Sequence, residues 1–318
     1  MSSQSRQLIA SLSLLLVSMA AHAADGPIKI VVGYPPGGAS DRVARLIADG
    51  LQKELHTPVI VENKVGAGGR ISAQAVKSAQ PNDPVLLLAN PAVMVVAPVV
   101  FPDAGYDAEK DFTALSLVND YEFGIAVAQD LPVSNINELT QWLKAHPQQA
   151  NFGVPATGSL PHFFGLMLGD AAKTPVEIIG YRGSAPLVTD LIGKQVPVAI
   201  DTFDVLQPQH TAQKIRLLAI SGTERNPLAS DVATLKEQGL NIVATGWNAL
   251  FTSASMNPAL RERLGRAVYQ VMQRPETRQQ FTASLLNPVA MTTAQTEASL
   301  RQYRAQWVPV VHNSGFKP

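Results

Sequence analysis

The segment from Ile28 to Leu55 constrains the fold more than any other part of the chain. It begins with a short β-branched apolar run, Ile28 to Val32, of the kind that fits a strand buried on both faces of a parallel sheet. A loop rich in glycine and proline follows, and from Ser40 apolar residues recur every three or four positions, as on one face of a helix. The pattern predicts a strand, a tight loop and a helix.

Such a junction can bind a small anion. The first turn of a helix has backbone N–H groups without intrahelical acceptors, and its dipole is positive at that end. A carboxylate would fit above the loop from Tyr34 to Ser40. The alternative is purely structural, because Gly37 and Gly38 could simply turn the chain while Ser40 or Asp41 caps the helix. This segment alone does not decide between the two interpretations.

The first 23 residues have the features of a secretory signal peptide. Arg6 gives a positive start, residues 8–19 form an apolar core, and Ala21-His22-Ala23 fits a small-x-small cleavage site. The apolar core is too short for a comfortable membrane span, and no cysteine is present that could carry a lipid. We therefore expect an exported, soluble protein from which the signal peptide, residues 1–23, is cleaved near Ala23.

The composition excludes several classes of function. With 25 basic and 25 acidic residues and no long basic run, the chain lacks the clustered positive charge that nucleic acids require. The absence of cysteine excludes disulfides, thiol catalysis and thiolate metal sites, and no two of the six histidines are spaced for a shared metal ion. We expect neither a metal, a cofactor nor a nucleic-acid partner.

A second loop of the same kind follows a predicted strand at 59–61. It ends in glycines, Gly66-Ala67-Gly68-Gly69, directly before a helical stretch at 70–77. A dinucleotide-binding fingerprint is the alternative interpretation of these glycines. Ile71 occupies the place of the third glycine, however, and the unit follows the second strand rather than the first. We therefore interpret it as a second loop that presents backbone.

A third loop, residues 155–159, adds the hydroxyls of Thr157 and Ser159 to the same arrangement. Strands and helices alternate along the rest of the chain, which favours an α/β fold with largely parallel sheets. Further strands are expected at 85–89, 112–118, 124–128, 151–154, 176–179, 196–200 and 215–220, and further helices at 136–145, 161–172, 185–192, 259–272 and 293–307.

The length of the chain and a restart of this rhythm near residue 125 predict two lobes. We place lobe 1 at residues 24–124 and 246–318 and lobe 2 at residues 125–245, with the chain crossing back at Gly246-Trp247. Each lobe would be a mostly parallel sheet flanked by helices. Because ligands bind beyond the carboxyl ends of such strands, the loops of both lobes would face one cleft.

Ser159 and His162 could form a nucleophile and its base, since residues three apart meet across one helical turn. No third residue that would orient His162 is recognisable, and a serine at a helix start is commonly a cap or a ligand contact. Asp201, at the end of a predicted strand, could be a general base or an anchor for a ligand or water. A secreted serine hydrolase using Ser159 and His162 is thus the alternative to a binding protein.

Several motifs occur in order along nearly the whole mature chain. They are Tyr34-Pro35-Pro36-Gly37-Gly38-x-x-Asp41-x-x-Ala44-Arg45, Val61-Glu62-Asn63-x-x-Gly66-Ala67-Gly68-Gly69, Tyr106-Asp107-x-x-x-Asp111-Phe112, Gly158-Ser159-x-x-His162, Tyr181-Arg182-Gly183-Ser184-Ala185-Pro186 and Arg225. Together they resemble the solute receptors of tripartite tricarboxylate transporters, the Bug family. The resemblance implies a periplasmic binding protein of the Venus-flytrap type, not an enzyme. Such a receptor, here expected to be a monomer, closes on a small organic carboxylate and delivers it to membrane permease subunits.

The resemblance also implies where the ligand binds. In that family the ligand's carboxylate is held by the first glycine-rich loop and by the hydroxyl-bearing loop of the other lobe, often through ordered waters. In this chain those loops are Tyr34 to Ser40 and Thr157 to Ser159. The complete predicted ligand-binding set is Tyr34, Pro36, Gly37, Gly38, Ser40, Asp41, Ala67, Gly68, Asn90, Thr157, Gly158, Ser159, His162, Tyr181 and Asp201.

Departures from the family pattern leave the ligand open. Arg70 and Ser72 stand where the family has Asn and Gly after the second loop, and Arg70 could pair with a second ligand carboxylate or, as we favour, face solvent. Asp41 would repel a carboxylate unless it caps the helix, which we favour, or pairs with a ligand cation. Dicarboxylates, tricarboxylates, acidic amino acids and aromatic acids are all compatible with the sequence.

Overall fold

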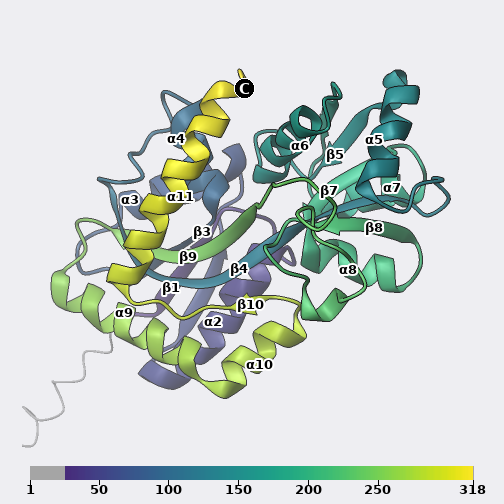
Figure 1. Ribbon diagram of the computed structural model, residues 1–318. Helices are drawn as coiled ribbons and strands as arrows, with labels where there is room; N and C mark the ends of the chain where they lie inside the picture. The colour runs from purple at the N-terminus through teal and green to yellow at the C-terminus, as the bar shows by residue number, and fades with distance from the viewer. Residues whose placement is uncertain (1–25, 318) are drawn as a thin grey trace, which may run out of the picture.

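The computed structural model describes residues 26–317, so the predicted signal peptide lies outside the described residues. The strands pair in the order β2-β1-β3-β9-β4-β7-β5-β6, and β8 and β10 also pair with β4. Helices pack around this series of strands in two groups (Figure 1). The α/β fold predicted from the sequence is confirmed.

The first group of elements, on the left of Figure 1, contains both ends of the described chain. β1 lies between β2 and β3 and is parallel to both, so the loops after these strands lie at one edge of the sheet. The elements are β1 (Ile28–Val32), α2 (Ala39–Leu55), β2 (Val59–Asn63), η1 (Ala67–Gly69), α3 (Arg70–Lys77), β3 (Val85–Ala89), the π-helical turn η2 (Ala92–Val96), α4 (Ala97–Val100), β9 (Thr245–Ser253), α9 (Pro258–Gln273), α10 (Pro275–Ala283), β10 (Asn287–Pro288) and α11 (Thr293–Asn313).

The second group repeats the parallel arrangement, because β5 lies between β6 and β7 and is parallel to both. Its elements are α5 (Ile136–Ala145), η3 (Pro147–Gln149), β5 (Asn151–Val154), α6 (Leu160–Ala171), β6 (Glu177–Gly180), α7 (Ser184–Ile192), β7 (Val198–Thr202), α8 (Phe203–Thr211), β8 (Ile215–Ile220) and η4 (Pro227–Ala229). The loops after β5 and β7 therefore also share an edge.

The amphipathic pattern that predicted α2 is explained by its packing. Val43, Ile47 and Leu51 are fully buried, and burying a side chain of this size contributes about 1.5–3 kcal/mol. α2 also approaches α9 closely, since a Cβ added at Gly50 would lie within 2.4 Å of a methyl carbon of Val271. A glycine is therefore required at this point of the helix.

The long strand β4 (Phe112–Ala128) joins the two groups. It pairs with β9 from Phe112 to Glu122 and with β7 and β8 over its second half. The sequence predicted two separate extended segments here, and a crossing of the chain back to lobe 1 at Gly246-Trp247. The polar residues between the two predicted segments pair with β9, so the segments form the single strand β4. Gly246 and Trp247 likewise lie inside β9. The predicted boundary at residues 124 and 125 falls inside β4.

The sheet is mixed rather than mostly parallel, because β4 is antiparallel to β7, β8, β9 and β10. Among the helical segments that were not predicted, two have a clear reason in the sequence. Pro208 lies inside α8, where a proline normally indicates a break, and the segment comprising η2 and α4 is almost entirely buried, so it lacks a polar face. Parallel pairing, with its loops at one edge, is confined to the strands nearest the two ends of the series.

Candidate functional site

Three loops of the first group meet at Tyr34, which follows β1. Its hydroxyl donates a hydrogen bond to Oδ1 of Asn90, after β3, at 3.2 Å. A Cβ added at Gly69, in the loop after β2, would lie 3.7 Å from the same hydroxyl. Burial raises the pKa of Tyr34, with Asn90 opposing the shift, so the phenol stays protonated. The structure thus brings together the predicted residues Tyr34 and Asn90 with the second glycine-rich loop.

Asp41 does not present its carboxylate to a ligand. Its oxygens accept hydrogen bonds from the Gly37 N–H at 2.8 Å, from Nε and Nη2 of Arg45 at 2.9 and 3.1 Å, and from Nδ2 of Asn63 at 2.9 Å. Burial alone would raise its pKa, but these hydrogen bonds hold the pKa below its usual value. Asp41 therefore holds the first loop in place through its own hydrogen bonds, a role similar to the helix capping that we favoured. Its carboxylate is occupied, so we do not include Asp41 among the proposed ligand contacts.

The first loop still offers backbone donors. Pro36, Gly37 and Gly38 are exposed, and Gly38 is the N-cap of α2 without a side-chain cap. The Gly37 N–H is taken by Asp41, but Ala39 and Ser40 lie in the first helical turn, where backbone N–H groups have no intrahelical acceptor. The anion-binding capacity therefore lies one or two residues later than the glycines themselves.

Ser40 connects this loop to the paired strands β4 and β9. Its hydroxyl donates to Oδ1 of Asn248 at 3.4 Å, and Nδ2 of Asn248 donates to Oδ1 of Asn119 at 3.0 Å. Both asparagines are buried, and they face each other where the register of the two strands shifts. Sequence reasoning missed them, although an asparagine inside an otherwise apolar strand was a signal.

In the second glycine-rich loop, Ala67 and Gly68 are exposed, with φ angles of 48° and 63°. This left-handed backbone is readily adopted by Gly68 and strained at Ala67. Both residues are exposed and carry little or no side chain, and their predicted ligand contact stays a prediction.

The loop between β5 and α6 is tied together by its own backbone. The Gly158 N–H donates to Nδ1 of His162 at 3.3 Å, and the Ser159 N–H donates to the Ala156 carbonyl at 3.2 Å. Thr157 is exposed and packs against Gly180, where an added Cβ would lie 2.8 Å from the Thr157 nitrogen. The Gly158 N–H is therefore occupied by His162 in this structure, and the predicted ligand contact of Gly158 stays a prediction.

Ser159 is the N-cap of α6, but its hydroxyl does not cap the helix. Its Oγ is buried and has no hydrogen-bond partner among the described residues. Leaving a buried hydroxyl unpaired costs about 1–3 kcal/mol. An external partner, a ligand or a water, would therefore be favourable at this atom.

His162 does not form a catalytic pair with Ser159 in this structure. Burial lowers its pKa, so the ring is neutral near pH 7, and its Nδ1 accepts from Gly158. Its ring packs against Phe163 and Phe316, with centroids at 5.2 and 4.8 Å. No acidic side chain orients it among the described residues, and this geometry does not support the hydrolase alternative.

The hydroxyl of Tyr181 is bonded to a side chain of α7. The hydroxyl donates to Oδ2 of Asp190 on α7 at 3.0 Å. Burial, followed by this contact with Asp190, raises the pKa of Tyr181 to about 12. Its hydroxyl is therefore occupied, and at most the ring could contact a ligand.

Asp201, at the end of β7, is buried with one oxygen unpaired. Oδ1 accepts from the Thr202 N–H at 2.7 Å, whereas Oδ2 lacks a hydrogen-bond partner within residues 26–317. Burial raises the pKa of Asp201 to about 7, although the Ser184 hydroxyl and the Thr202 N–H favour the ionised form. Near neutral pH this carboxyl can therefore both donate and accept a hydrogen bond.

Tyr121 on β4 lies between the two groups of loops. Burial raises its pKa, and interactions with Tyr34, Asp204 and Asp201 raise it further. Its ring also covers Gly246 of β9, where a Cβ would lie 2.2 Å from a ring carbon. Sequence reasoning had no basis for singling out Tyr121, because tyrosine is common in strands.

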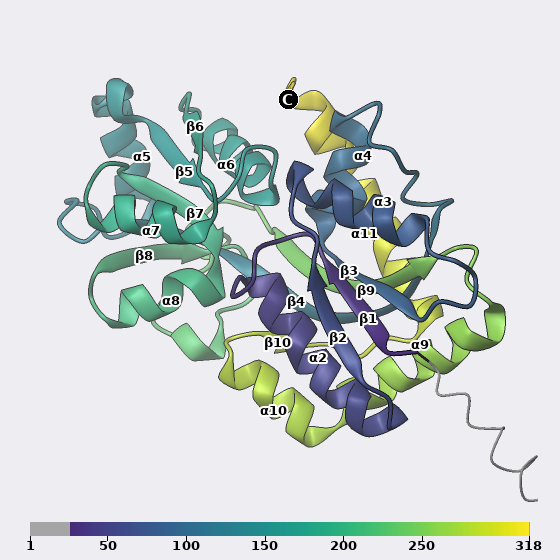
Figure 2. The same cartoon turned by 180° about the vertical axis from the view of Figure 1, so that it is seen from behind.

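Two contacts connect the loops of the first group to those of the second. Nη2 of Arg42, in the first turn of α2, lies 2.5 Å from Oδ2 of Asp204, at the start of α8. Beyond α11, the Phe316 ring lies against His162, and a Cβ added at Gly158 would be 3.4 Å from it. In both views the C-terminal end of α11 lies between α4 and α6 (Figure 2).

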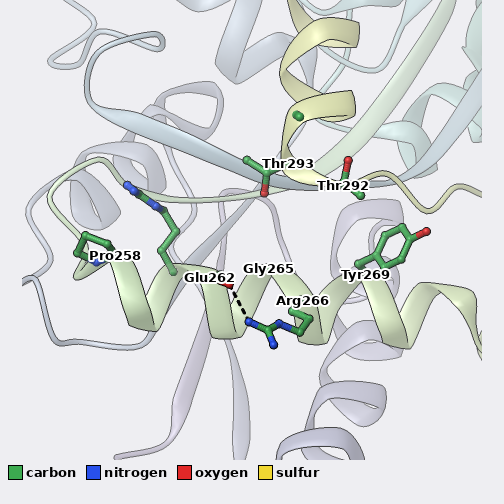
Figure 3. A pocket seen from close by; sticks show the side chains of 9 residues that line it. Pro258, Glu262, Gly265, Arg266, Tyr269, Thr292 and Thr293 are labelled. Carbon is green, nitrogen blue, oxygen red and sulfur yellow. Dashed lines mark hydrogen bonds and ion pairs between the residues drawn. The ribbon is translucent and has the colours of Figure 1, made fainter.

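Two surface cavities lie away from these residues. One, of about 540 Å³, is formed by α9 and the start of α11, and its lining includes Arg261, Tyr269 and Thr293 (Figure 3). The other, of about 500 Å³, lies at the end of α6 around Lys173. In residues 26–317 no three acidic or histidine side chains group as metal ligands. Nor does that part of the chain contain a helix with the length and hydrophobicity of a membrane span.

Comparison with known proteins gives consistent matches over almost the whole chain. Residues 43–316 match the family described as the tripartite tricarboxylate transporter family receptor. The chain is 32% identical to a UPF0065 protein of Bordetella bronchiseptica, covering 92% of this chain and 87% of that protein. It is 30% identical to the protein BugT of Bordetella pertussis, covering 92% and 90%. The solved structure of the periplasmic binding protein BugD is similar, with 27% identity, a TM-score of 0.82, and coverage of 92% and 99%.

Proposed function

This chain belongs to the tripartite tricarboxylate transporter family of receptors, and on that premise we propose that it captures a small organic carboxylate and delivers it to the membrane permease subunits of such a transporter. It is a solute-binding receptor by family. We further propose that the ligand binds between two lobes, lobe 1 comprising residues 24–124 and 246–318 and lobe 2 residues 125–245, and that the mature receptor is a periplasmic monomer.

The ion pair between Arg42 and Asp204 carries this proposal. Arg42 belongs to the first turn of α2, where Ala39 and Ser40 have backbone N–H groups without intrahelical acceptors. Asp204, at the start of α8, follows Asp201 of β7 by three residues. The pair supports a single site in which donors from the first loop and polar atoms from the second group face one ligand.

The proposed ligand contacts are those with unused hydrogen-bonding capacity. In the first group these are the backbone N–H groups of Ala39 and Ser40; in the second group they are Oγ of Ser159 and Oδ2 of Asp201. A carboxylate has two oxygens that accept several hydrogen bonds, so it can satisfy donors from both sides at once. The protonated form of Asp201 would add a donor, whereas the ionised form would repel the ligand.

Transport then follows from a shift in population between open and closed forms. A ligand that makes hydrogen bonds to both lobes only in the closed form stabilises closure by its differential affinity for that form. The permease would recognise the closed, loaded receptor. In this scheme the neutral His162 holds the second loop in shape and has no chemical step to perform.

Thermal unfolding with a panel of about twenty small carboxylates tests the proposal. A ligand at 100 times its dissociation constant adds about 2.7 kcal/mol to stability, which shifts the midpoint by several degrees. We expect at least one acid to raise the midpoint and to be recovered unchanged after incubation. Absence of binding across the panel would contradict the proposal, and so would conversion of an acid that is lost in Ser159→Ala.

A further inference from the structure

Arg70 is placed beside the point where the three loops of the first group meet. It is the first residue of α3 and directly follows Gly69, which packs against the Tyr34 ring. From the sequence we favoured a position facing solvent for Arg70. In the structure the residue is half-buried. Arg70 therefore adjoins the loop that meets Tyr34 and Asn90, two residues of the ligand-binding set predicted from the sequence.

The guanidinium of Arg70 is held against an aromatic ring. Its Cζ lies 3.6 Å from the centroid of Phe101, the residue that ends α4. At this distance the group rests on the face of the ring, a favourable cation–π contact, while its N–H donors point outward from its edge. The ring orients the charge, and within residues 26–317 no hydrogen bond or ion pair occupies the N–H donors of the guanidinium.

Nearby groups indicate where this charge acts. Burial raises the pKa of Tyr106, Tyr34 raises it further, and Arg70 opposes the shift. Arg70 and Tyr34 therefore both lie close to Tyr106, which follows α4 in the chain. An arginine remains charged at any physiological pH.

Arg70 has no carboxylate partner within residues 26–317. The acidic turn that follows Tyr106 does not supply one, because its carboxylates are already paired with lysine or arginine. Those pairs are Asp107 with Lys110, Asp111 with Lys77 and Glu109 with Arg304. A partly desolvated guanidinium without an anion is unfavourable, and a carboxylate can satisfy it with two parallel hydrogen bonds.

We propose that Arg70 binds the second carboxylate of a dicarboxylate ligand, and so determines which acids this receptor accepts. The inference rests on the proposed function, because it requires the first carboxylate to be held by the loop at the start of α2. Arg70 is then a specificity-determining residue. A ligand with only one carboxylate would leave it unpaired.

The test compares each dicarboxylate with the monocarboxylate of the same chain length, for example succinate with butyrate and glutarate with pentanoate. Affinities are measured by isothermal titration calorimetry for the full receptor, Arg70→Gln and Arg70→Lys. Arg301→Gln, at an exposed position on α11, is the matched control. Because charge-assisted bidentate hydrogen bonds are strong, Arg70→Gln should lose about 10–100-fold in affinity for the diacid. It should leave monoacid affinity unchanged, and Arg70→Lys should be intermediate.

The outcomes separate this inference from the proposed function. If the unmodified receptor binds diacids and monoacids equally, or if Arg70→Gln weakens both to the same extent, Arg70 does not recognise a second carboxylate, while the receptor function stands. If the unmodified receptor binds no carboxylate of either kind, both proposals are wrong. If Arg301→Gln loses as much affinity for the diacid as Arg70→Gln does, the effect comes from the net charge of the protein and not from the site, and the inference is wrong.

Discussion

Replacement of Asp201 by asparagine should change how the stability of the protein depends on pH. The Asp201 carboxyl is 1% exposed, and one of its oxygens has no partner in the described part of the chain. Burial disfavours its charged form and raises its pKa from 3.8 to about 7. The folded protein therefore binds this proton more tightly than the unfolded chain does.

The sign and size of the effect follow from this difference. Between pH 4 and 7 the folded state holds a proton that the unfolded state has lost, so the contribution of Asp201 to stability falls as pH rises. Below pH 4 the contribution is fully present. A shift of about three pKa units at 1.36 kcal/mol per unit gives a loss of about 4 kcal/mol by the time pH exceeds 7. Asparagine cannot ionise, so Asp201→Asn should not show this loss.

Urea unfolding at intervals between pH 4 and 8 measures the effect. We expect Asp201→Asn to gain stability relative to the unmodified protein as pH rises, by up to about 4 kcal/mol at pH 8, with no relative gain at pH 4. Asp49→Asn, at an exposed position on α2, controls for the substitution itself. Parallel stability curves for Asp201→Asn and the unmodified protein would refute the assignment of a raised pKa to this carboxyl.

Two further predictions concern the contacts between the two groups of elements. Arg42→Ala should lower the free energy of unfolding by about 1–2 kcal/mol, because it leaves the buried Asp204 side chain, 2% exposed, without this partner. The loss is modest because the Arg42 side chain is 43% exposed, so the pair is only partly desolvated. Adding Asp204→Asn should recover part of that loss in urea unfolding, and purely additive losses would contradict the pairing. Phe316→Ala should lower the free energy of unfolding by about 1–2 kcal/mol, because its ring packs against His162 and lies next to Gly158. It should also weaken carboxylate binding several-fold in calorimetry. Unchanged affinity would show that the C-terminal segment does not position this loop.

Short-range pattern was enough to predict much of the fold. The helix at 70–77 and the strand at 85–89 are found at their predicted bounds, since periodicity and glycine placement are properties of neighbouring residues. The family was also identifiable from motifs spread along the chain, and the match over residues 43–316 confirms it. The glycine-rich loops predicted an anion site because any strand-to-helix junction of this kind presents backbone N–H groups.

The tertiary structure decided which of those groups remain available. Asp41 and Gly158 are occupied by partners within the protein, whereas Ser159 and Asp201 keep an unpaired buried atom. The sequence alone could not distinguish these cases, because burial and hydrogen bonding depend on elements brought together from distant parts of the chain. Long-range pairing also made β4 one strand and placed Phe316 on the loop before α6. Local composition determines which elements can form, and packing determines which polar atoms are left for a ligand.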